Sequence, residues 1–290
     1  MAGIIDLIGN TPMVEIKRLN PNPNVRIFGK LEGNNPGGSV KDRAALNMIR
    51  SALERGDIKP GTKLVEATSG NTGIALAMIA CLYGIEIELV MPNNSTRERT
   101  LTMEAFGAKV TLLDGIELCR DYADEKGAIE GYFLLNQFAN PDNYAAHYKT
   151  TGPEIWRDTE GQITHFVSSM GTTGTIMGCS RYFKEINPDI QIVGCQPTEG
   201  SSIPGIRRWP VEYLPKIFEP ERVDRVMDIS EAEATAMSRK LAKVEGVFAG
   251  MSSGGAMAAA VKLAAELTEG TIVFICCDRG DRYLSSELFG

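Results

Sequence analysis

Lys41 lies where a turn-rich loop changes into a helical pattern. Residues 33–40 are rich in Gly, Asn and Pro, which favour turns. After Lys41, apolar residues recur at three- and four-residue steps until Gly56, which predicts a helix that ends there. The partial positive charge of a helix N-terminus disfavours an ammonium, so we expect a lowered lysine pKa and an amine able to form a Schiff base. Taken alone, a solvated lysine would be the simpler interpretation.

A second candidate is the loop at residues 171–175, Gly-Thr-Thr-Gly-Thr, between a predicted strand and a predicted helix. Backbone amides and threonine hydroxyls at a helix N-terminus can hold a phosphate. The loop is not a P-loop, because no Gly-Lys-Ser/Thr follows, and it lacks the GxGxxG spacing of a dinucleotide site. A tight turn that merely needs glycine is the alternative.

Residues 68–73, Thr-Ser-Gly-Asn-Thr-Gly, form a third polar loop between a strand and a helix. Its hydroxyls and helix-start amides could bind a carboxylate, and Asn71 would be free to contact a ring oxygen. The alternative is an ordinary Ser/Thr helix cap. Ser252 precedes an Ala-rich helix expected over residues 256–267, where a helix cap is also the simpler interpretation.

The elements that position these loops alternate between strands and helices, which predicts an α/β fold with mostly parallel sheets. Ligands bind at the carboxyl-end loops of such sheets. We expect strands at residues 13–16, 25–28, 63–67, 85–91, 109–113, 132–136, 166–170, 190–196 and 271–276. Capping boxes are expected at Ser95 with Glu98 and at Ser230 with Glu233. The turn at residues 140–143 is the best boundary, giving domains 1–142 and 143–290.

Length and composition fit a globular chain with two domains. The chain has 290 residues, of which 43% are hydrophobic and 23% charged. A net charge of −7 with interspersed signs argues against nucleic acid or an anionic membrane as a partner. No apolar stretch reaches membrane-span length, and the start does not resemble a signal peptide. The six cysteines lack CxxC spacing and only two histidines are present, so we expect no metal and reduced thiols in a cytoplasmic protein.

Together, these stretches resemble the fold-type II pyridoxal-phosphate enzymes, specifically the O-acetylserine sulfhydrylases, or cysteine synthases. The carrying motifs occur in the family's order and span nearly the whole chain: residues 8–12, 31–36, 39–43, 66–73, 171–175 and 252–255. Residues 199–209 and 277–283 resemble the B type of this family, although the chain ends at Gly290, earlier than that type leads us to expect. The resemblance implies a tryptophan synthase β-like fold of two α/β domains, with the cofactor between them and residues 12–33 crossing to the second domain.

The resemblance also implies roles for individual residues. Lys41 would hold pyridoxal 5′-phosphate and move protons, Asn71 would contact the ring hydroxyl, and Ser252 would face the pyridine nitrogen. The cofactor phosphate would be held by Gly171, Thr172, Thr173, Gly174 and Thr175. The substrate carboxylate would be held by Thr68, Ser69, Thr72 and Gln137.

The activity implied by the resemblance is β-replacement. O-acetyl-L-serine and sulfide would give L-cysteine through an α-aminoacrylate intermediate, in a homodimer. The B type also implies S-sulfocysteine from thiosulfate, with Arg207 as a positive group at the mouth of the site. A cystathionine β-synthase-like or serine/threonine dehydratase-like enzyme is the nearest alternative. A non-catalytic amino-acid-binding module on the same fold is the alternative from another class.

Overall fold

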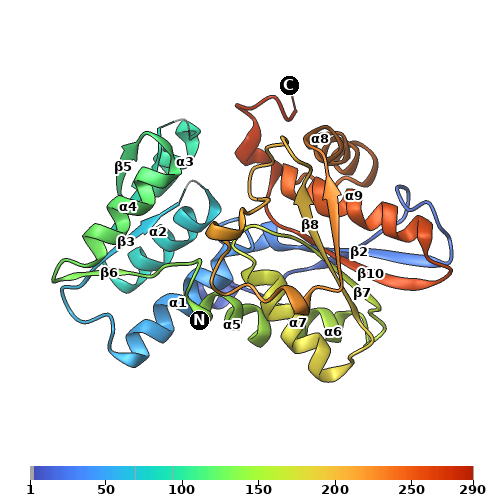
Figure 1. Cartoon of the computed structure of the whole chain (residues 1–290), viewed down its shortest axis with the longest axis horizontal. Helices are drawn as coiled ribbons and strands as arrows, with labels where there is room; N and C mark the ends of the chain where they lie inside the picture. Colours follow the sequence, from blue (N-terminus) through green and yellow to red (C-terminus); the bar gives the residue numbers. More distant parts are fainter. Residues whose placement is uncertain (1–2, 69, 94, 290) are drawn as a thin grey trace.

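The computed structural model describes residues 3–68, 70–93 and 95–289, and its strands form two sheets (Figure 1). The larger sheet has the order β1-β2-β10-β7-β8-β9. Its strands are β1 (Met13–Ile16), β2 (Val25–Leu31), β7 (His165–Ser169), β8 (Gln191–Pro197), β9 (Arg225–Ile229) and β10 (Gly270–Cys276). The smaller sheet has the order β5-β4-β3-β6. Its strands are β3 (Lys63–Ala67), β4 (Ile87–Pro92), β5 (Lys109–Leu113) and β6 (Tyr132–Leu134).

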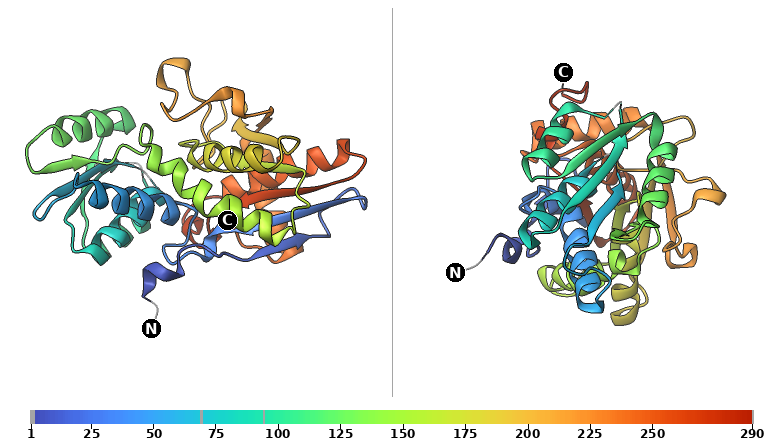
Figure 2. Two further views of the ribbon diagram at one scale, coloured as in Figure 1. Left: turned by 90° about the horizontal axis from the view of Figure 1, so that it is seen from below. Right: turned by 90° about the vertical axis from the view of Figure 1, so that its left-hand side faces the viewer.

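All pairs of neighbouring strands are parallel except β1 and β2, in which Met13 lies opposite Lys30. The predicted α/β class with mostly parallel sheets is therefore confirmed. Strand β2 pairs along its whole length with β10, so the early segment of the chain lies beside the last strand (Figure 2, left). The domain division at residue 142 stays a prediction, because α5 (Pro141–Lys149) begins there and contacts both α1 and α7.

Helices cover both sheets. The remaining α-helices are α1 (Lys41–Arg55), α2 (Asn71–Tyr83), α3 (Arg97–Ala105), α4 (Gly115–Gly127), α6 (Thr151–Asp158), α7 (Gly174–Ile186), α8 (Glu231–Lys240) and α9 (Met251–Glu266). The short helices are η1 (Ile4–Leu7), η2 (Glu32–Asn34), η3 (Val211–Tyr213), η4 (Pro220–Arg222), the π-helical η5 (Leu241–Glu245) and η6 (Gly280–Tyr283). Gly56 and Gly84 end α1 and α2 in the left-handed conformation, at φ 78° and 65°, as their positions predict.

Three local expectations need correction. The capping box of Ser230 with Glu233 is present, but the one at Ser95 is wrong, because α3 begins at Arg97 after an extended Thr96. Strand β9 was not expected, because this edge strand is short and has only two buried residues, Met227 and Ile229, so its apolar pattern is weak. Strand β4 begins later than expected, because the Ile85 amide still bonds to the Ala80 carbonyl at the end of α2.

Each sheet has an apolar core on both faces. In the larger sheet, α9 packs on one face and Phe183 of α7 packs against Phe166 on the other. In the smaller sheet, α1 and α2 cover one face and α4 covers the other. Helix α2 is apolar around its circumference because it is buried between these neighbours. Within the described residues, no helix has both the length and the apolar character needed to cross a membrane.

Candidate active site

Lys41 is the first residue of α1, and contacts with the end of β10 fix the loop before it. The Val40 amide donates to the Cys277 carbonyl at 2.8 Å, and Ser39 pairs with Asp278 as an isolated antiparallel bridge. Burial lowers the pKa of Lys41. The predicted direction is therefore confirmed, but its principal cause is desolvation, which the helix-start argument did not include.

The turn of α1 that carries Lys41 is anchored by a buried ion-pair network. Arg43 is 3% exposed and binds Glu32 and Glu154, each at 2.7 Å, and it also donates to the Thr11 hydroxyl at 3.1 Å. Lys30, which is fully buried, pairs with Glu154 at 3.0 Å. Burial alone would raise the pKa of Glu154, but the bonded Arg43 guanidinium lowers it to about 2. The motifs around residues 11, 32 and 43 therefore hold the lysine loop in place.

Asp42 lies beside Lys41, with its side chain turned into the protein. It accepts the Gly37 amide at 2.5 Å, while its Oδ1 is a buried atom with no hydrogen-bond partner among the described residues. Burial raises the pKa of Asp42 to about 7. Asp42 thus closes the turn before the reactive lysine, and its adjacency to Lys41 was the only sequence signal for this contact.

The loop at residues 171–175 has the geometry of an anion cradle. Helix α7 begins at Gly174, and Thr173 before it has a left-handed backbone with φ 68°. An added Cβ at Gly171 would lie 2.6 Å from the Gly205 carbonyl oxygen, so the backbone approaches too closely for a side chain. In the described part of the chain, the Thr173 hydroxyl is buried without a hydrogen-bond partner. A buried, unpaired donor at a helix start fits a phosphate.

His147 of α5 contacts the loop at residues 171–175 through Thr175. Its Nε2 lies 3.4 Å from the Thr175 hydroxyl, and its Nδ1 lies 2.9 Å from the Thr151 hydroxyl. Burial, with smaller contributions from Arg43 and Lys41, lowers the pKa of His147 well below its usual value. The ring is therefore neutral and adds no charge beneath the loop. Neither Asn143, described next, nor His147 was singled out as a site residue from the sequence.

Residues 68–73 and residues 171–175 are called here the carboxylate loop and the phosphate loop, after the groups that they are expected to bind. The two loops are joined through Gln137 and Asn143. The Thr72 hydroxyl donates to Gln137 Oε1 at 2.8 Å, as expected for two residues of one binding site. Asn143 Nδ2 donates to the Gln137 carbonyl at 2.7 Å and to the Thr172 hydroxyl at 3.3 Å. Thr68 is buried close to Thr72, and Ser69 lies outside the described residues.

Asn71 begins α2 and has both ends of its side-chain amide bound by the C-terminal segment. Its Nδ2 donates to Asp278 Oδ2 at 2.7 Å, and its Oδ1 accepts from Arg282. Tyr283 also donates to Asp278 Oδ2, at 2.6 Å, and Arg282 donates to the Gly37 carbonyl. Contact between Asn71 and a cofactor ring stays a prediction, and it would replace one of these bonds.

Ser252 lies in the first turn of α9, whose N-cap is Gly250, so the helix-cap interpretation of this serine is wrong. Its carbonyl accepts from the Ser169 hydroxyl at 2.7 Å, and its side chain is buried. Burial raises the pKa of the neighbouring Cys277 thiol to about 12, against a lowering contact from Ser252. Ser252 is therefore in contact with Cys277, on which the charge of Lys41 also acts.

The two arginines of the 200–210 segment differ in their contacts. Arg208 pairs with Asp228 at 2.6 Å and donates to the Pro197 carbonyl. The Arg207 guanidinium is exposed and lies 5.8 Å from the centre of the Trp209 ring, and within the described residues it forms no ion pair. Trp209 in turn donates to the Gly171 carbonyl at 2.7 Å. Arg207 is thus a free cation next to the phosphate loop.

These residues fit pyridoxal phosphate. In the described residues, the chain offers a partly buried amine with a lowered pKa in Lys41 and an unpaired buried hydroxyl in Thr173 at a helix start. At the position expected to face the pyridine nitrogen, the chain offers the uncharged hydroxyl of Ser252 and not a carboxylate. The roles of the individual residues stay predictions, because no contact with the cofactor is present.

Asp42, Asn143, His147, Asp278 and Arg282 were missed as site residues. Asp42, Asn143, Asp278 and Arg282 lie in or next to loops that follow a strand or begin a helix, which was the available signal, whereas His147 lies in the last turn of α5 and had no such signal. Their partners lie far away in the sequence: Asn71 and Asp278 are 207 positions apart. Only the fold brings them together.

Comparison with known proteins identifies the family of the chain. Residues 4–278 match the family model described as pyridoxal-phosphate dependent enzyme. Cysteine synthase B of Pseudomonas aeruginosa is 58% identical over 289 residues, covering 99% of this chain and 97% of that protein. The crystal structure of a cysteine synthase from Entamoeba histolytica superimposes with a TM-score of 0.94 at 37% identity, covering 100% of this chain and 90% of the other. An O-acetylserine dependent cystathionine beta-synthase from Helicobacter pylori gives 0.92 at 38% identity, covering 100% and 99%. The chain therefore belongs to the pyridoxal-phosphate dependent enzymes and, among them, to the cysteine synthases.

Proposed function

We propose that this chain makes L-cysteine from O-acetyl-L-serine and sulfide, with acetate as the leaving group. The observation that carries the proposal is Lys41, a partly buried amine of lowered pKa at the start of α1. The similarity to cysteine synthase B over nearly the full length supports the choice of reaction.

Bound pyridoxal phosphate supplies an electron sink that acidifies the Cα–H bond of the amino-acid substrate. The chain binds and orients that substrate. The Thr68 and Thr72 hydroxyls and the Gln137 amide would hold its carboxylate, and the existing bond from Thr72 to Gln137 keeps two of these groups pre-positioned. Asn143 bonds to both Gln137 and Thr172, which helps to hold the carboxylate loop and the phosphate loop at a fixed distance from each other.

Lys41 is the group that moves the proton. Because burial lowers the pKa of its amine, a larger fraction is unprotonated near neutral pH and can accept the Cα proton. Because Ser252 carries no charge, the pyridine nitrogen expected to face it would stay unprotonated. The cofactor would then be a milder electron sink. A mild sink suits a reaction in which the leaving group departs promptly.

Lys41→Ala tests the proposal. We expect the visible absorbance of the lysine-bound cofactor to disappear and cysteine formation to fall by several orders of magnitude. Bound cofactor should still be detectable by fluorescence or mass spectrometry of the extracted pyridoxal phosphate, which separates loss of chemistry from loss of binding. Full turnover in Lys41→Ala would refute the assignment.

Product analysis separates the related reactions. The fold is similar to that of a protein described as an O-acetylserine dependent cystathionine beta-synthase, so the two reactions have to be distinguished by their products. O-acetylserine and serine should each be supplied with sulfide and with homocysteine. Cysteine from O-acetylserine and sulfide as the fastest reaction supports the proposal, whereas cystathionine or pyruvate as the main product supports one of the alternatives.

We also propose four finer properties. The enzyme uses thiosulfate through the free Arg207 guanidinium, acts as a homodimer and is cytoplasmic, as bacterial relatives and the reduced-thiol composition suggest. Its two domains divide near residue 142, with residues 12–33 in the second. Light scattering of the purified holoenzyme tests the dimer, and limited proteolysis near residues 136–141 tests the division.

A further inference from the structure

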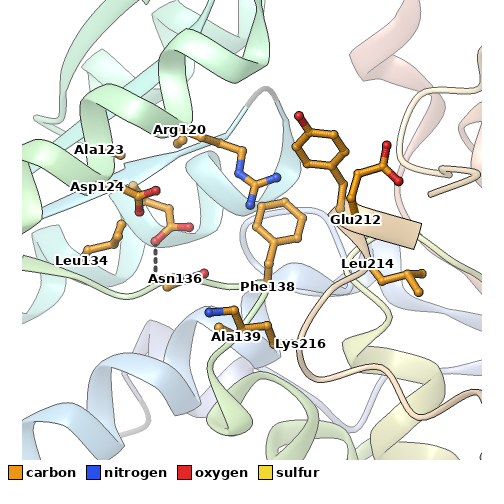
Figure 3. Close-up of a pocket in the computed structure, with 13 residues that line it drawn as sticks. Arg120, Ala123, Asp124, Leu134, Asn136, Phe138, Ala139, Glu212, Leu214 and Lys216 are labelled. Carbon is orange, nitrogen blue, oxygen red and sulfur yellow. Dashed lines mark hydrogen bonds between the residues drawn. The ribbon is translucent and has the colours of Figure 1, made fainter. Parts of the chain in front are cut away.

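A cavity of about 260 Å³ is lined by Asn136 and Phe138, the residues on either side of Gln137 (Figure 3). One wall is formed by α4 and the end of β6, and the opposite wall by residues 212–216, which include the end of η3. None of the described residues expected to hold the cofactor or the substrate lines this cavity. It is therefore separate from the site described above.

The cavity carries charges of both signs. Arg120 and Lys216 are its cations, and Asp124, Glu212 and Glu66 are its acids. In the part of the chain that the structure describes, neither cation forms an ion pair, although Arg120 lies 5.1 Å from the centre of the Phe138 ring. Figure 3 shows the Arg120 guanidinium directed over Phe138 and the Lys216 ammonium approaching from the opposite side, with Asp124 on the wall formed by α4.

The protonation state of Glu66 decides the net charge of the cavity. Its carboxylate accepts the Asn136 amide at 2.8 Å and the Gln137 amide at 3.3 Å. Burial raises the pKa of Glu66 to about 7, and the charge of Asp124 adds to the effect. Near neutral pH, Glu66 is therefore partly protonated, and the two remaining acids balance the two cations. A cavity with separated charges and little net charge favours a zwitterion over a simple anion or cation.

We propose that this cavity binds a small free α-amino acid. Its carboxylate would lie between Arg120 and Lys216, and its ammonium would face Asp124. Drug-sized ligands occupy pockets of about 300–1,000 Å³, so the present volume suits an amino acid with a short side chain. Phe138 and Leu214 provide the apolar surface for that side chain.

Two residues that line the cavity, Glu66 and Phe138, are linked to both loops of the candidate active site through Gln137 and Trp209. Glu66 holds the Gln137 amide, and Gln137 accepts from Thr72 of the carboxylate loop. Phe138 packs edge-on against Trp209 at 5.6 Å, and Trp209 bonds to the Gly171 carbonyl of the phosphate loop. An occupant would therefore bias the position of both loops. Binding does not depend on the proposed function; only its effect on turnover rests on it.

The test is calorimetric titration of the holoenzyme with N,N-dimethylglycine. This tertiary amine keeps the charges of a zwitterion but cannot form an imine with the cofactor. We expect saturable binding with no change in the visible absorbance of the cofactor. Acetate and dimethylamine, which each carry one of the two charges, should bind at least about tenfold more weakly because each loses one set of charge-assisted contacts.

Single variants locate the probe. Arg120→Gln and Lys216→Gln should each weaken binding by about tenfold or more, whereas Lys240→Gln, an exposed charge on α8, should not change it. Thr72→Val should retain binding, because Thr72 belongs to the other site. If Arg120→Gln does not fold, the exposed Lys216 still carries the test.

Two outcomes would overturn the inference. One is no saturable binding to the wild-type holoenzyme. The other is binding that is lost in Thr72→Val but unchanged in Arg120→Gln and Lys216→Gln, which would place the probe in the candidate active site. Neither outcome concerns cysteine formation, so the proposed function would stand or fall separately.

Discussion

Arg43→Met should destabilise the protein strongly, because it removes the centre of the buried network beneath Lys41. The Arg43 side chain is almost fully buried and bonds to Glu32 and Glu154. Methionine has a similar length but no charge, so both carboxylates would lose their strongest partner. Breaking a buried ion pair by removing one member costs about 3–5 kcal/mol.

The magnitude follows independently from Glu154. A pKa of about 2 in the folded protein, against an ordinary value of 4.5, corresponds to about 3 kcal/mol of stabilisation of the charged form. Because the folded pKa is depressed, this stabilisation is present above about pH 4.5 and is lost as the pH falls toward 2. Arg43→Met should therefore remove about 3 kcal/mol at pH 7 and much of the acid dependence that Glu154 contributes.

The assay is urea unfolding of wild type and variant, followed by far-ultraviolet circular dichroism at pH 7 and at pH 4. Arg55→Met is the matched control on the same helix, because Arg55 pairs with Asp57 and Asp142 at the surface. Exposed pairs contribute about 0–1 kcal/mol. A loss in Arg43→Met no greater than that in Arg55→Met, or an equal loss at pH 4 and pH 7, would refute the reasoning.

Three further perturbations test other parts of the site. Gly174→Ala should weaken cofactor binding by tenfold or more, because the new Cβ would overlap with Asn143 Oδ1, and adding Asn143→Ala should restore part of the affinity measured by fluorescence titration. Asp42→Asn should raise the melting temperature relative to wild type as the pH rises from about 4 to about 7, because the raised pKa means that wild type loses stability over that interval; a constant difference across pH would contradict this. Arg207→Ala should slow the second step with thiosulfate far more than the second step with sulfide, because a guanidinium binds oxyanions and sulfide needs no such group; equal losses in stopped-flow measurements would remove Arg207 from the mechanism.

Local signals in the sequence determined the elements and the order of the loops. Strands β3 and β5 have the predicted bounds, because turn residues and changes in apolar pattern mark their ends. Gly56 and Gly84 mark the ends of α1 and α2, because each adopts the left-handed conformation that favours glycine. The position of Lys41 at a helix start and the family resemblance also came from the order of residues alone.

Only the tertiary structure decided which groups meet and how they are charged. Lys41 has a lowered pKa mainly because other segments bury it, and a helix pattern does not reveal burial. The Asn71 amide is bound by Asp278 and Arg282, which are 207 and 211 positions away. Ser252 lies inside α9 because Gly250 is the cap, although serine is the stronger capping residue. Such contacts arise when two sheets from distant parts of the chain pack together, and local periodicity carries no information about that packing.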